Sequence, residues 1–451
     1  MSRSFVLGDA GDLRRDQLGT YERALAASGD LFRFRIGPPR VGLRFDAVFR
    51  PECAHDVLAS RSGSYVKDVP AYTEVARIVG PGLLTSEGDV WRRDRRILQP
   101  VFTRRRVAES VDVIATGAAD LVAMWGNGAG SGSGDQVVDL HAGATRYALR
   151  VLSLAVFGDD VEAAGPVIAG ALPVLNEYAT RRALSPLAAP AWWPSPYNRR
   201  AARFRRDLWD MVEELIARRS DGASHDDLLG RLLSARDPET GAALSRAAVR
   251  AHALTILLAG HETTASSLAF TLHLLGRYPA VQERVRHEVM AAVGEGRIAA
   301  AHLDGLRYTA QVVDEALRLY PPVHTLVRRA GAASTLCGHR IPRGRIVAVS
   351  VWGIHRNPAV WPEPERFEPD RFDGGEGAPP DDRYTHLPFG GGPRACLGRF
   401  LATAELVTAV AAVVRAYRIQ SPEERPQLDA GITLRPAGAL RCRLEPLAGA
   451  R

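Results

Sequence analysis

The sequence is almost without lysine. Of its 58 basic residues only Lys67 is a lysine, and all others are arginine. The net formal charge is +7, but the basic residues are dispersed among 51 acidic ones. Nucleic-acid sites gather basic residues on one face or along one stripe. The dispersal therefore argues against a nucleic-acid partner and is more typical of a docking face for an acidic protein.

Cysteine is scarce as well, and no Cys-x-x-Cys pair occurs. The four residues are Cys53, Cys337, Cys396 and Cys442. They lie too far apart in sequence to suggest a zinc site or an iron–sulfur cluster. Four cysteines without a pattern favour a reducing compartment. Residues 1–18 contain no long apolar run, so we expect neither a signal peptide nor a membrane anchor. The expectation is a cytoplasmic monomer.

Hydrophobic residues make up 46% of the 451 positions, enough for one large domain over 1–451. Alternating apolar residues around Gly37 predict a hairpin within 31–49, and further strands are expected in a β-rich part formed by about 31–50, 325–352 and 430–446. The last of these is expected to hold a hairpin over 435–444. The rest is mainly helical, so the fold class is mainly α with a smaller β-rich part (α+β).

Several other segments have a predicted character. Residues 62–86 are expected to be an irregular apolar loop, and 126–135, rich in glycine and serine, a flexible surface connection. A long helix is predicted over 246–277 and another over 400–416, from apolar residues at helical spacing.

A glycine-rich loop lies directly before the last of these helices. It runs over 388–398 and reads PFGGGPRACLG. Three glycines and a proline cannot continue a helix or a strand. Cys396 therefore lies where a loop enters a helix, and backbone N–H groups and the helix dipole stabilise a thiolate there. A buried structural cysteine is the alternative.

The loop resembles the haem-binding segment of the cytochrome P-450 family, Phe-Gly-x-Gly-x-Arg-x-Cys-x-Gly. The matching residues are Phe389, Gly390, Gly392, Arg394, Cys396 and Gly398. The resemblance implies the cytochrome P-450 fold of the soluble bacterial type, a haem b cofactor and Cys396 as the axial ligand of its iron. Such a thiolate favours cleavage of the O–O bond of O2.

Three further motifs occur in the family's order. Trp91 and Arg95, in WRRDR, resemble its Trp-x-x-x-Arg pair that reaches a haem propionate, and Arg328 resembles a third propionate ligand. Glu315 and Arg318 resemble its Glu-x-x-Arg motif, which a downstream arginine completes as a structural triad. Arg371 in FEPDRF fills that place, with Arg366 as a rival.

The predicted helix over 246–277 carries the fourth motif. Its centre, AGHETT from Ala259 to Thr264, resembles the family's oxygen-activating segment. Glu262 and Thr263 would be the catalytic acid–alcohol pair, with Ala259 and Gly260 beside the haem. We expect Thr263 and Thr264 to bond carbonyl groups earlier in the helix and produce a local bulge. Hydrogen-bonded helix residues without a chemical role are the alternative.

The resemblance implies a monooxygenase that inserts one oxygen atom of O2 into a C–H bond of a hydrophobic small molecule, by hydroxylation or epoxidation. The alternatives are a peroxide-driven haem enzyme and a non-catalytic haem-binding sensor or carrier. No flavin or iron–sulfur module is visible. Electrons would therefore come from a ferredoxin and its NAD(P)H-dependent reductase, which we expect to dock on Arg92, Arg93, Arg96 and Arg399.

The substrate class stays open between terpenoid and fatty-acyl or polyketide-like molecules. The proline-rich segment 185–200, with Trp192 and Trp193, is interpreted as a lid over an apolar pocket rather than a membrane-surface patch. The residues expected to line that pocket are Val75, Ile256, Val323, His324, Leu326, Val327, Ile432 and Thr433.

Overall fold

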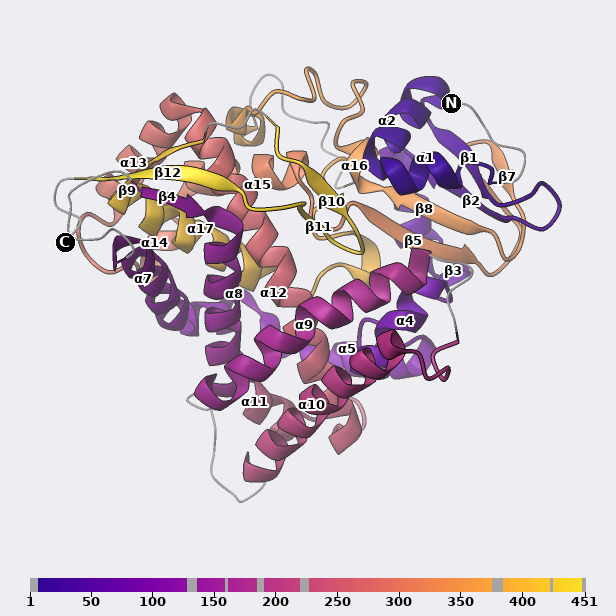
Figure 1. Ribbon diagram of the computed structural model, residues 1–451, viewed down its shortest axis with the longest axis horizontal. Helices are drawn as coiled ribbons and strands as arrows, with labels where there is room; N and C mark the ends of the chain where they lie inside the picture. The colour runs from indigo at the N-terminus through magenta and orange to yellow at the C-terminus, as the bar shows by residue number, and fades with distance from the viewer. Residues whose placement is uncertain are drawn as a thin grey trace. The chain divides into compact units, whose positions relative to one another are not determined.

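The computed structural model describes residues 7–127, 136–158, 161–184, 190–219, 227–374, 384–421 and 425–447. Helices predominate among them, accompanied by four small sheets (Figure 1). The chain divides into two compact units. Unit 1 comprises 1–69, 311–396 and 428–435, and unit 2 comprises 70–310, 397–427 and 436–451. Most of the predicted connection over 126–135 lies outside the described residues.

Unit 1 is built on a five-stranded sheet with the strand order β1-β2-β8-β5-β3. Its strands are β1 (Leu31–Ile36), β2 (Leu43–Val48), β3 (Tyr65–Val66), β5 (Thr325–Ala330) and β8 (Ile346–Ser350). Strands β1 and β2 form the predicted antiparallel hairpin, pairing Leu31 with Val48. Strand β8 is parallel to β2 and antiparallel to β5, and all five of its residues are buried. Strand β5 is therefore paired with β8, the central strand of the sheet.

The remaining elements of unit 1 surround this sheet. They are α1 (Ala10–Arg15), α2 (Gln17–Ser28), α3 (Pro51–His55), the π-helix η1 (Asp56–Ser60), η2 (Ser62–Ser64), most of α15 (Arg307–Leu319), β6 (Ser334–Leu336), β7 (His339–Ile341), α16 (Val351–Ile354), η5 (Pro369–Asp373), η6 (Gly392–Arg394), β10 (Leu428–Ala430) and β11 (Leu434–Pro436). Its apolar core joins α3 and η1 to the inner side chains of β8. That core supports the loop that carries Cys396.

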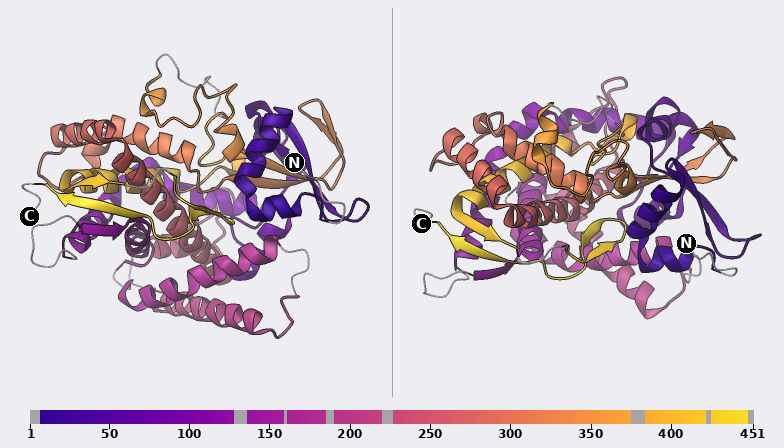
Figure 2. Two further views of the ribbon diagram at one scale, coloured as in Figure 1. Left: turned by 45° about the horizontal axis from the view of Figure 1, so that its top comes forward. Right: turned by 90° about the horizontal axis from the view of Figure 1, so that it is seen from above.

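Unit 2 is mostly helical. Its elements are α4 (Pro70–Val79), α5 (Gly88–Leu98), η3 (Gln99–Phe102), α6 (Arg104–Glu109), α7 (Val111–Asn127), β4 (Gln136–Asp139), α8 (Leu140–Phe157), α9 (Val161–Leu184), α10 (Pro196–Arg219), α11 (Leu228–Ser234), α12 (Arg246–Arg277), α13 (Pro279–Ala292), α14 (Ala300–Leu303), α17 (Arg399–Ala416), β9 (Tyr417–Gln420) and β12 (Arg441–Pro446). Helices α9 and α10 lie side by side in both views of Figure 2.

Helix α12 is the centre of unit 2 and has the predicted bounds. Ser245 caps its first turn by accepting a hydrogen bond from the N–H of Ala248. The helix packs against α8 and α17, and almost every residue from Ala265 to Gly276 is buried. It is α-helical throughout, so the local bulge expected at AGHETT does not form.

Two predicted segments differ from the structure. Residues 62–86 are not an irregular loop, because Pro70 begins a helix whose apolar face, with Val75 and Ile78, packs against α9.

The hairpin expected over 435–444 is also wrong. Strand β11 pairs with β10, whereas β12 pairs with β4 and β9. Alternation along one strand gives no information about which distant strand will pair with it.

Cys53 and Cys337 form a disulfide in unit 1, with their Cα atoms 5.8 Å apart. Cys53 belongs to α3 and is buried, and Cys337 lies in the turn between β6 and β7. Four cysteines without a pattern favour a reducing compartment, and nothing in their spacing predicts this bond. The 284 positions between the two residues hide a contact that only the fold creates.

Candidate active site

The loop before α17 holds Cys396 by its backbone. The N–H of Cys396 donates a 2.8 Å hydrogen bond to the carbonyl of Phe389, and the N–H of Ala395 donates to Gly392 at 3.0 Å. The short helix η6 ends at Arg394, and α17 begins at Arg399 with Gly398 as its N-cap. Cys396 is exposed and outside the disulfide. The thiol therefore lies at an accessible loop-to-helix junction, as the sequence predicted.

Two glycines of the loop are required by its geometry. Gly390 and Gly392 both have φ of +68°, a left-handed conformation that disfavours side chains. A Cβ at Gly392 would also lie 1.9 Å from the carbonyl oxygen of Leu58 in η1. Gly398 differs, because its φ is not left-handed and no atom lies within 4 Å of the position that a Cβ would take. Gly392 thus lets the loop rest directly on η1.

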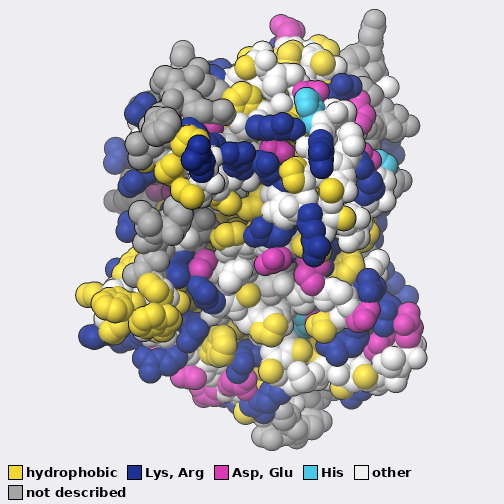
Figure 3. All heavy atoms as spheres, turned by 90° about the vertical axis from the view of Figure 1, so that its right-hand side faces the viewer, with side chains coloured by type: hydrophobic (Ala, Val, Ile, Leu, Met, Phe, Trp, Pro, Cys, Tyr) yellow, Lys and Arg dark blue, Asp and Glu magenta, His cyan; other side chains and the backbone are white. Residues whose placement is uncertain are grey.

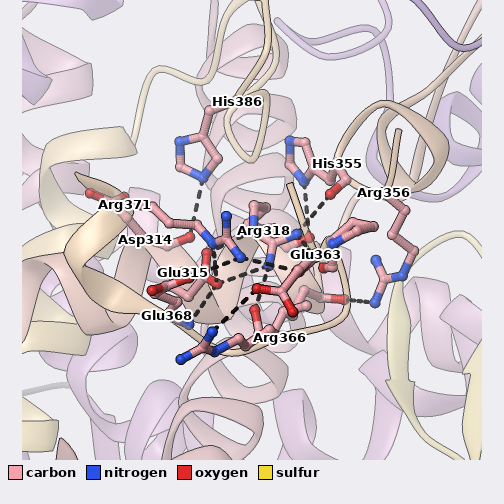
Figure 4. Close-up of polar contacts among 12 residues, drawn as sticks. Asp314, Glu315, Arg318, His355, Arg356, Glu363, Arg366, Glu368, Arg371 and His386 are labelled. Atoms are coloured by element: carbon pink, nitrogen blue, oxygen red, sulfur yellow. Dashed lines mark hydrogen bonds and ion pairs between the residues drawn. The ribbon is translucent and has the colours of Figure 1, made fainter. Parts of the chain in front are cut away.

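A buried ion-pair network lies in the same unit (Figure 4). Arg318, wholly buried, donates from Nε and Nη2 to the two carboxylate oxygens of Glu315 at 2.6 and 2.8 Å. Its remaining donors bond the carbonyls of His355, Pro364 and Arg366 at 2.8, 2.7 and 3.1 Å. All five N–H donors of the guanidinium are therefore used. An arginine in this place fastens two chain segments to α15, the end of α16 at His355 and the loop that contains Pro364 and Arg366.

Arg371 completes the network, and the side chain of Arg366 does not. Nε of Arg371 lies 3.6 Å from Oε1 of Glu315, and Nη2 lies 3.1 Å from a carboxylate oxygen of Glu368. The Arg366 side chain points to Glu363 and is largely exposed. Burial raises the pKa of Glu315, and the bonds from Arg318 and from the Glu368 N–H act against that shift. The structure brings together Glu315, Arg318 and Arg371.

His355 connects this network to the cysteine loop, a link that the sequence analysis missed. Its Nε2 accepts a 2.8 Å hydrogen bond from the N–H of Leu387, so Nδ1 carries the proton and faces the carbonyl of Arg318 at 3.1 Å. Burial holds the pKa of His355 well below its ordinary value, so the ring is neutral. The Leu387 carbonyl in turn accepts from Gly390. The loop position thus depends on Arg318 through one histidine.

The other unit 1 residues of the predicted site lie on or near β5. Val323 and His324 precede the strand, and His324 bonds the carbonyl of Gly431 at 3.0 Å through Nε2. This contact brings the predicted pocket residues Ile432 and Thr433 near to those of β5. The partly exposed members of the predicted pocket are Val323, Leu326, Val327, Ile432 and Thr433. Arg328 is buried, and its guanidinium bonds the carbonyl of Val327 at 2.8 Å.

In unit 2, α12 opens to solvent in its middle. Ile256, Ala259, Gly260 and Thr263 are partly or fully exposed, whereas Leu257, His261 and Thr264 between them are buried. The spacing of three and four residues places the exposed residues on one helical face. Gly260 has a packing role, because a Cβ there would lie 3.2 Å from Leu152 of α8. A strip of accessible backbone and hydroxyl groups thus interrupts a buried helix.

The acid and the alcohol of AGHETT are neighbours in the sequence, and both side chains are partly exposed. The hydroxyl of Thr263 donates a 2.6 Å hydrogen bond to the Ala259 carbonyl, as expected for a threonine inside a helix. The carboxylate of Glu262 accepts a hydrogen bond from the side-chain amide of Asn176 on α9. Asn176 was not predicted, since nothing in sequence links positions 86 apart. It holds the acid towards α9.

Thr264 differs from its predicted contact. Its hydroxyl donates a 3.1 Å hydrogen bond to a side-chain oxygen of Glu405 on α17, whereas a bond to a helix carbonyl was expected. Glu405 is buried, and burial raises its pKa to about 8, an effect that the bond from Thr264 opposes. On α12, burial also lowers the pKa of His261 to about 4. A neutral acid and a neutral imidazole therefore lie behind the accessible strip.

Trp91 and Arg95 lie four residues apart on α5, both partly exposed. Between them Asp94 is buried and 3.2 Å from Nε2 of His252 on α12. Burial raises the pKa of Asp94, but the bonds from His252 and Arg93 outweigh it and hold that pKa below its ordinary value. An ionised Asp94 thereby attaches α5 to the central helix and fixes how the pair is presented.

The predicted residues fall into two groups by unit. Cys396, Arg394, Phe389, Arg328, the triad and the β5 residues belong to unit 1, and Trp91, Arg95, Val75 and the α12 residues belong to unit 2. Val75 is buried in the face of α4. Trp192 and Trp193, interpreted as part of a lid, are among the most exposed apolar side chains described.

The model of the family "Cytochrome P450" matches residues 5–441. The chain belongs to the cytochrome P450 family. Cyclooctat-9-en-7-ol 5-monooxygenase of Streptomyces melanosporofaciens is 36% identical over 88% of this chain and 84% of the relative. Cyclooctatin synthase of the same organism is 33% identical over 94% and 90%. The crystal structure of the cytochrome P450DA heme domain aligns with a TM-score of 0.84 at 27% identity, covering 95% of this chain and 93% of that one.

The fold is therefore that of a cytochrome P450, and the chain is a P450 monooxygenase with a haem-thiolate cofactor. The residues present fit such a group, because a haem iron takes a single cysteine as its proteinaceous ligand in this class. No group of three or more potential metal-binding side chains occurs in the described ranges. Cys396 needs no such companions. Among the helices of those ranges, none is long and apolar enough to cross a membrane.

Proposed function

We propose that this P450 hydroxylates or epoxidises an unactivated C–H or C=C position of a terpenoid-like substrate, and that the thiolate of Cys396 would hold its haem iron. The observation that carries the proposal is the accessible middle of α12, where the neighbours Glu262 and Thr263 are both partly exposed in a helix that is mostly buried. When bound, the haem supplies the activation of O2. The support for a terpenoid is the name of the relative that oxidises cyclooctat-9-en-7-ol.

The chain's own residues would divide the remaining work. Trp91, Arg95 and Arg328 would bind the haem propionates, since an arginine offers paired donors to a carboxylate. Phe389 and Arg394 would flank the ligand, and Gly390, Gly392, Ala259 and Gly260 would allow close approach. The hydroxyl of Thr263 would bind the water molecule that delivers a proton. The carboxyl group of Glu262 would supply protons to it once its hydrogen bond with the Asn176 amide is broken.

Val75, Ile256, Val323, His324, Leu326, Val327, Ile432 and Thr433 remain the proposed pocket lining. Fatty-acyl and polyketide-like molecules remain the second substrate class. A screen that follows the shift of the haem absorption on adding terpenoids, fatty acids and macrolides separates these classes. A shift with fatty acids alone would overturn the terpenoid assignment.

Two other reaction modes would fit a haem protein, a peroxide-driven enzyme and a sensor or carrier without catalysis. The Glu262–Thr263 pair favours the O2-dependent reaction, because a peroxide-driven enzyme has no need of proton delivery to O2. The test is product formation with a reductase system and, separately, with peroxide alone. Product only with the reductase supports the proposal. Product only with peroxide, or no product from any substrate that shifts the haem spectrum, contradicts it.

We further propose a cytoplasmic, monomeric, single-domain protein that receives electrons from a ferredoxin and its NAD(P)H-dependent reductase. The expected dock needs revision, because Arg93 and Arg96 form ion pairs with the buried acids Asp94 and Asp237. Arg92 is exposed but lies 2.7 Å from Asp89. Better candidates flank Phe400: Arg104 of α6 and Arg399 of α17 have their guanidinium carbons 5.3 and 4.8 Å from its ring centre.

The dock is tested by the rate of first electron transfer from an acidic ferredoxin. Charge reversal at Arg104 or Arg399 should lower this rate and its dependence on salt, since exposed charges attract over about 8–10 Å at physiological ionic strength. Substrate affinity should not change. Rates that ignore both salt and reversal would contradict an electrostatic dock, and turnover with NAD(P)H alone would contradict a separate partner.

A further inference from the structure

Two tryptophans are held out into solvent at the turn between α9 and α10. Trp192 is 77% exposed and Trp193 is 53% exposed. They are the only tryptophans among the large apolar side chains that the described residues expose. Figure 3 shows hydrophobic side chains projecting at the level of this turn, beside Lys and Arg side chains. Contiguous exposed apolar side chains that are rimmed by polar residues mark interaction sites.

Hydrogen bonds within the turn and to both neighbouring helices fix its path. The backbone N–H of Trp193 donates a hydrogen bond to the carbonyl of Pro190 at 2.9 Å, and the backbone N–H of Ser195 donates to the carbonyl of Trp193 at 2.8 Å. The side-chain amide of Asn198, a buried residue, bonds the same two carbonyls at 2.9 and 2.8 Å. Tyr178 of α9 donates to the Asn198 amide oxygen at 3.2 Å. Both neighbouring helices thus fasten the turn and leave the indoles outside.

The surroundings of the turn are basic. Between Glu177 and Asp207 the sequence has no acidic residue, and α10 begins with PYNRRAARFRR. Arg199, Arg200 and Arg203 are exposed in the first turns of this helix, and of the three only Arg203 has an acid near it in the described part of the chain, with Nε 4.0 Å from a carboxylate oxygen of Asp207. Cations are unfavourable at a helix N-terminus, where the dipole and the backbone N–H groups attract anions. Phosphate groups would relieve this repulsion.

We propose that this turn binds the surface of an anionic lipid bilayer. Trp192 and Trp193 would lie at the headgroup level, where amphipathic indole rings accumulate, while Arg199, Arg200 and Arg203 contact lipid phosphates. Positively charged groups next to an anionic membrane each add to the affinity, and interfacial aromatic groups add apolar contact. The contact is peripheral and needs no spanning helix. Resting on the proposed function, it would bring the enzyme to the phase in which apolar substrates dissolve.

The experiment is co-sedimentation of the haem-loaded protein with vesicles of phosphatidylglycerol mixed with phosphatidylcholine, compared with vesicles of phosphatidylcholine alone. We expect binding to the mixed vesicles that weakens with salt. Each positive charge near the membrane is expected to contribute about fivefold to the partition constant. The double variant Arg199→Gln/Arg200→Gln should therefore lower that constant by at least about tenfold. Trp192→Ala/Trp193→Ala should lower binding to a similar extent. Both variants change exposed side chains, so folding should be unaffected.

Matched controls separate the turn from general stickiness. Arg14→Gln/Arg15→Gln removes two exposed charges of α1, and Val137→Ala trims another exposed apolar residue. Both should bind as the wild type does. Failure of the wild type to bind mixed vesicles, equal binding to phosphatidylcholine alone, or equal losses in the controls would each overturn the proposal. So would tryptophan-dependent self-association without lipid binding, because a second copy would then cover the turn. No turnover is measured, so the result is independent of the proposed reaction.

Discussion

The hydroxyl of Thr264 on α12 donates a 3.1 Å hydrogen bond to the carboxyl group of Glu405 on α17. The carbonyl of Glu405 also accepts a 2.8 Å bond from the hydroxyl of Tyr147 on α8. A titratable group thus lies where the three main helices of unit 2 meet. Because burial raises the pKa of Glu405 to about 8, this carboxyl group retains its proton at neutral pH.

Glu405 should make stability depend on pH. Its pKa rises from 4.5 to about 8 on folding, so between these values the folded state keeps a proton that the unfolded state has lost. Stability is then greatest below pH 4.5 as far as this group is concerned, and it falls as the pH rises to about 8, by about 1.4 kcal/mol per unit of pKa shift at most.

The measurement is urea unfolding of the holoenzyme and of Glu405→Gln across this pH range. The amide cannot ionise, so the variant should gain stability relative to the wild type as the pH rises. Glu214→Gln, which changes an exposed glutamate, is the control and should follow the wild type. Parallel curves for the wild type and Glu405→Gln would contradict the raised pKa.

Breaking the Arg318 network should remove the support of the cysteine loop. Glu315→Ala or Arg318→Ala leaves a buried charge without its partner, a loss of about 3–5 kcal/mol. Little haem-loaded protein should be recovered, because His355 and Leu387 link the network to the loop. Arg366→Ala removes a largely exposed side chain and should cost at most about 0.5 kcal/mol. Normal haem content and unfolding midpoints in the first two variants would refute this role.

Thr263→Ala should impair proton delivery and leave substrate binding intact. The hydroxyl lies on the accessible strip of α12, and its loss removes a polar group without altering helix packing. Reducing equivalents should then appear as peroxide, lowering the ratio of product to NAD(P)H consumed. Thr263→Ser keeps the hydroxyl and should retain most of the coupling. If Thr263→Ala couples as well as the wild type, Thr263 has no part in the mechanism.

The disulfide predicts a simple thiol count. In denaturant without reductant, two of the four cysteines, Cys396 and Cys442, should react with a thiol reagent. Cys53→Ser and Cys337→Ser should each lower stability by about 2–5 kcal/mol, and the double variant should lose no more than either one. Four reactive thiols, or additive losses, would show that the two residues do not form a bond.

The sequence was sufficient wherever the signal is local. The sequence signal predicts the hairpin of β1 and β2, the bounds of α12 and the tight glycine-rich loop before Cys396 from residue types at short spacing. The motif residues were found because their spacing is specific, not because their contacts were known. Arg371 rather than Arg366 was chosen on spacing, and the structure brings it to Glu315.

Features that depend on distant contacts were missed. Asn176 reaches Glu262 from another helix, Glu405 reaches Thr264, and His355 reaches Leu387. Each pair is separated by a stretch of chain whose path cannot be read from composition. The same holds for the partners of β12 and for Arg96, which forms an ion pair with Asp237, 141 positions further along the chain. A basic residue in the sequence can therefore be paired within the fold and unavailable to a partner.

The central claim, that Cys396 provides the thiolate of a P450 haem, is tested most directly by the absorption spectrum of the reduced carbon monoxide complex. The wild type should show the strongly red-shifted band that thiolate donation opposite the bound gas produces. Cys396→His should retain haem and lose that shift, while Cys442→Ser, which changes the other cysteine outside the disulfide, should keep it. A red-shifted band that survives in Cys396→His would contradict the account.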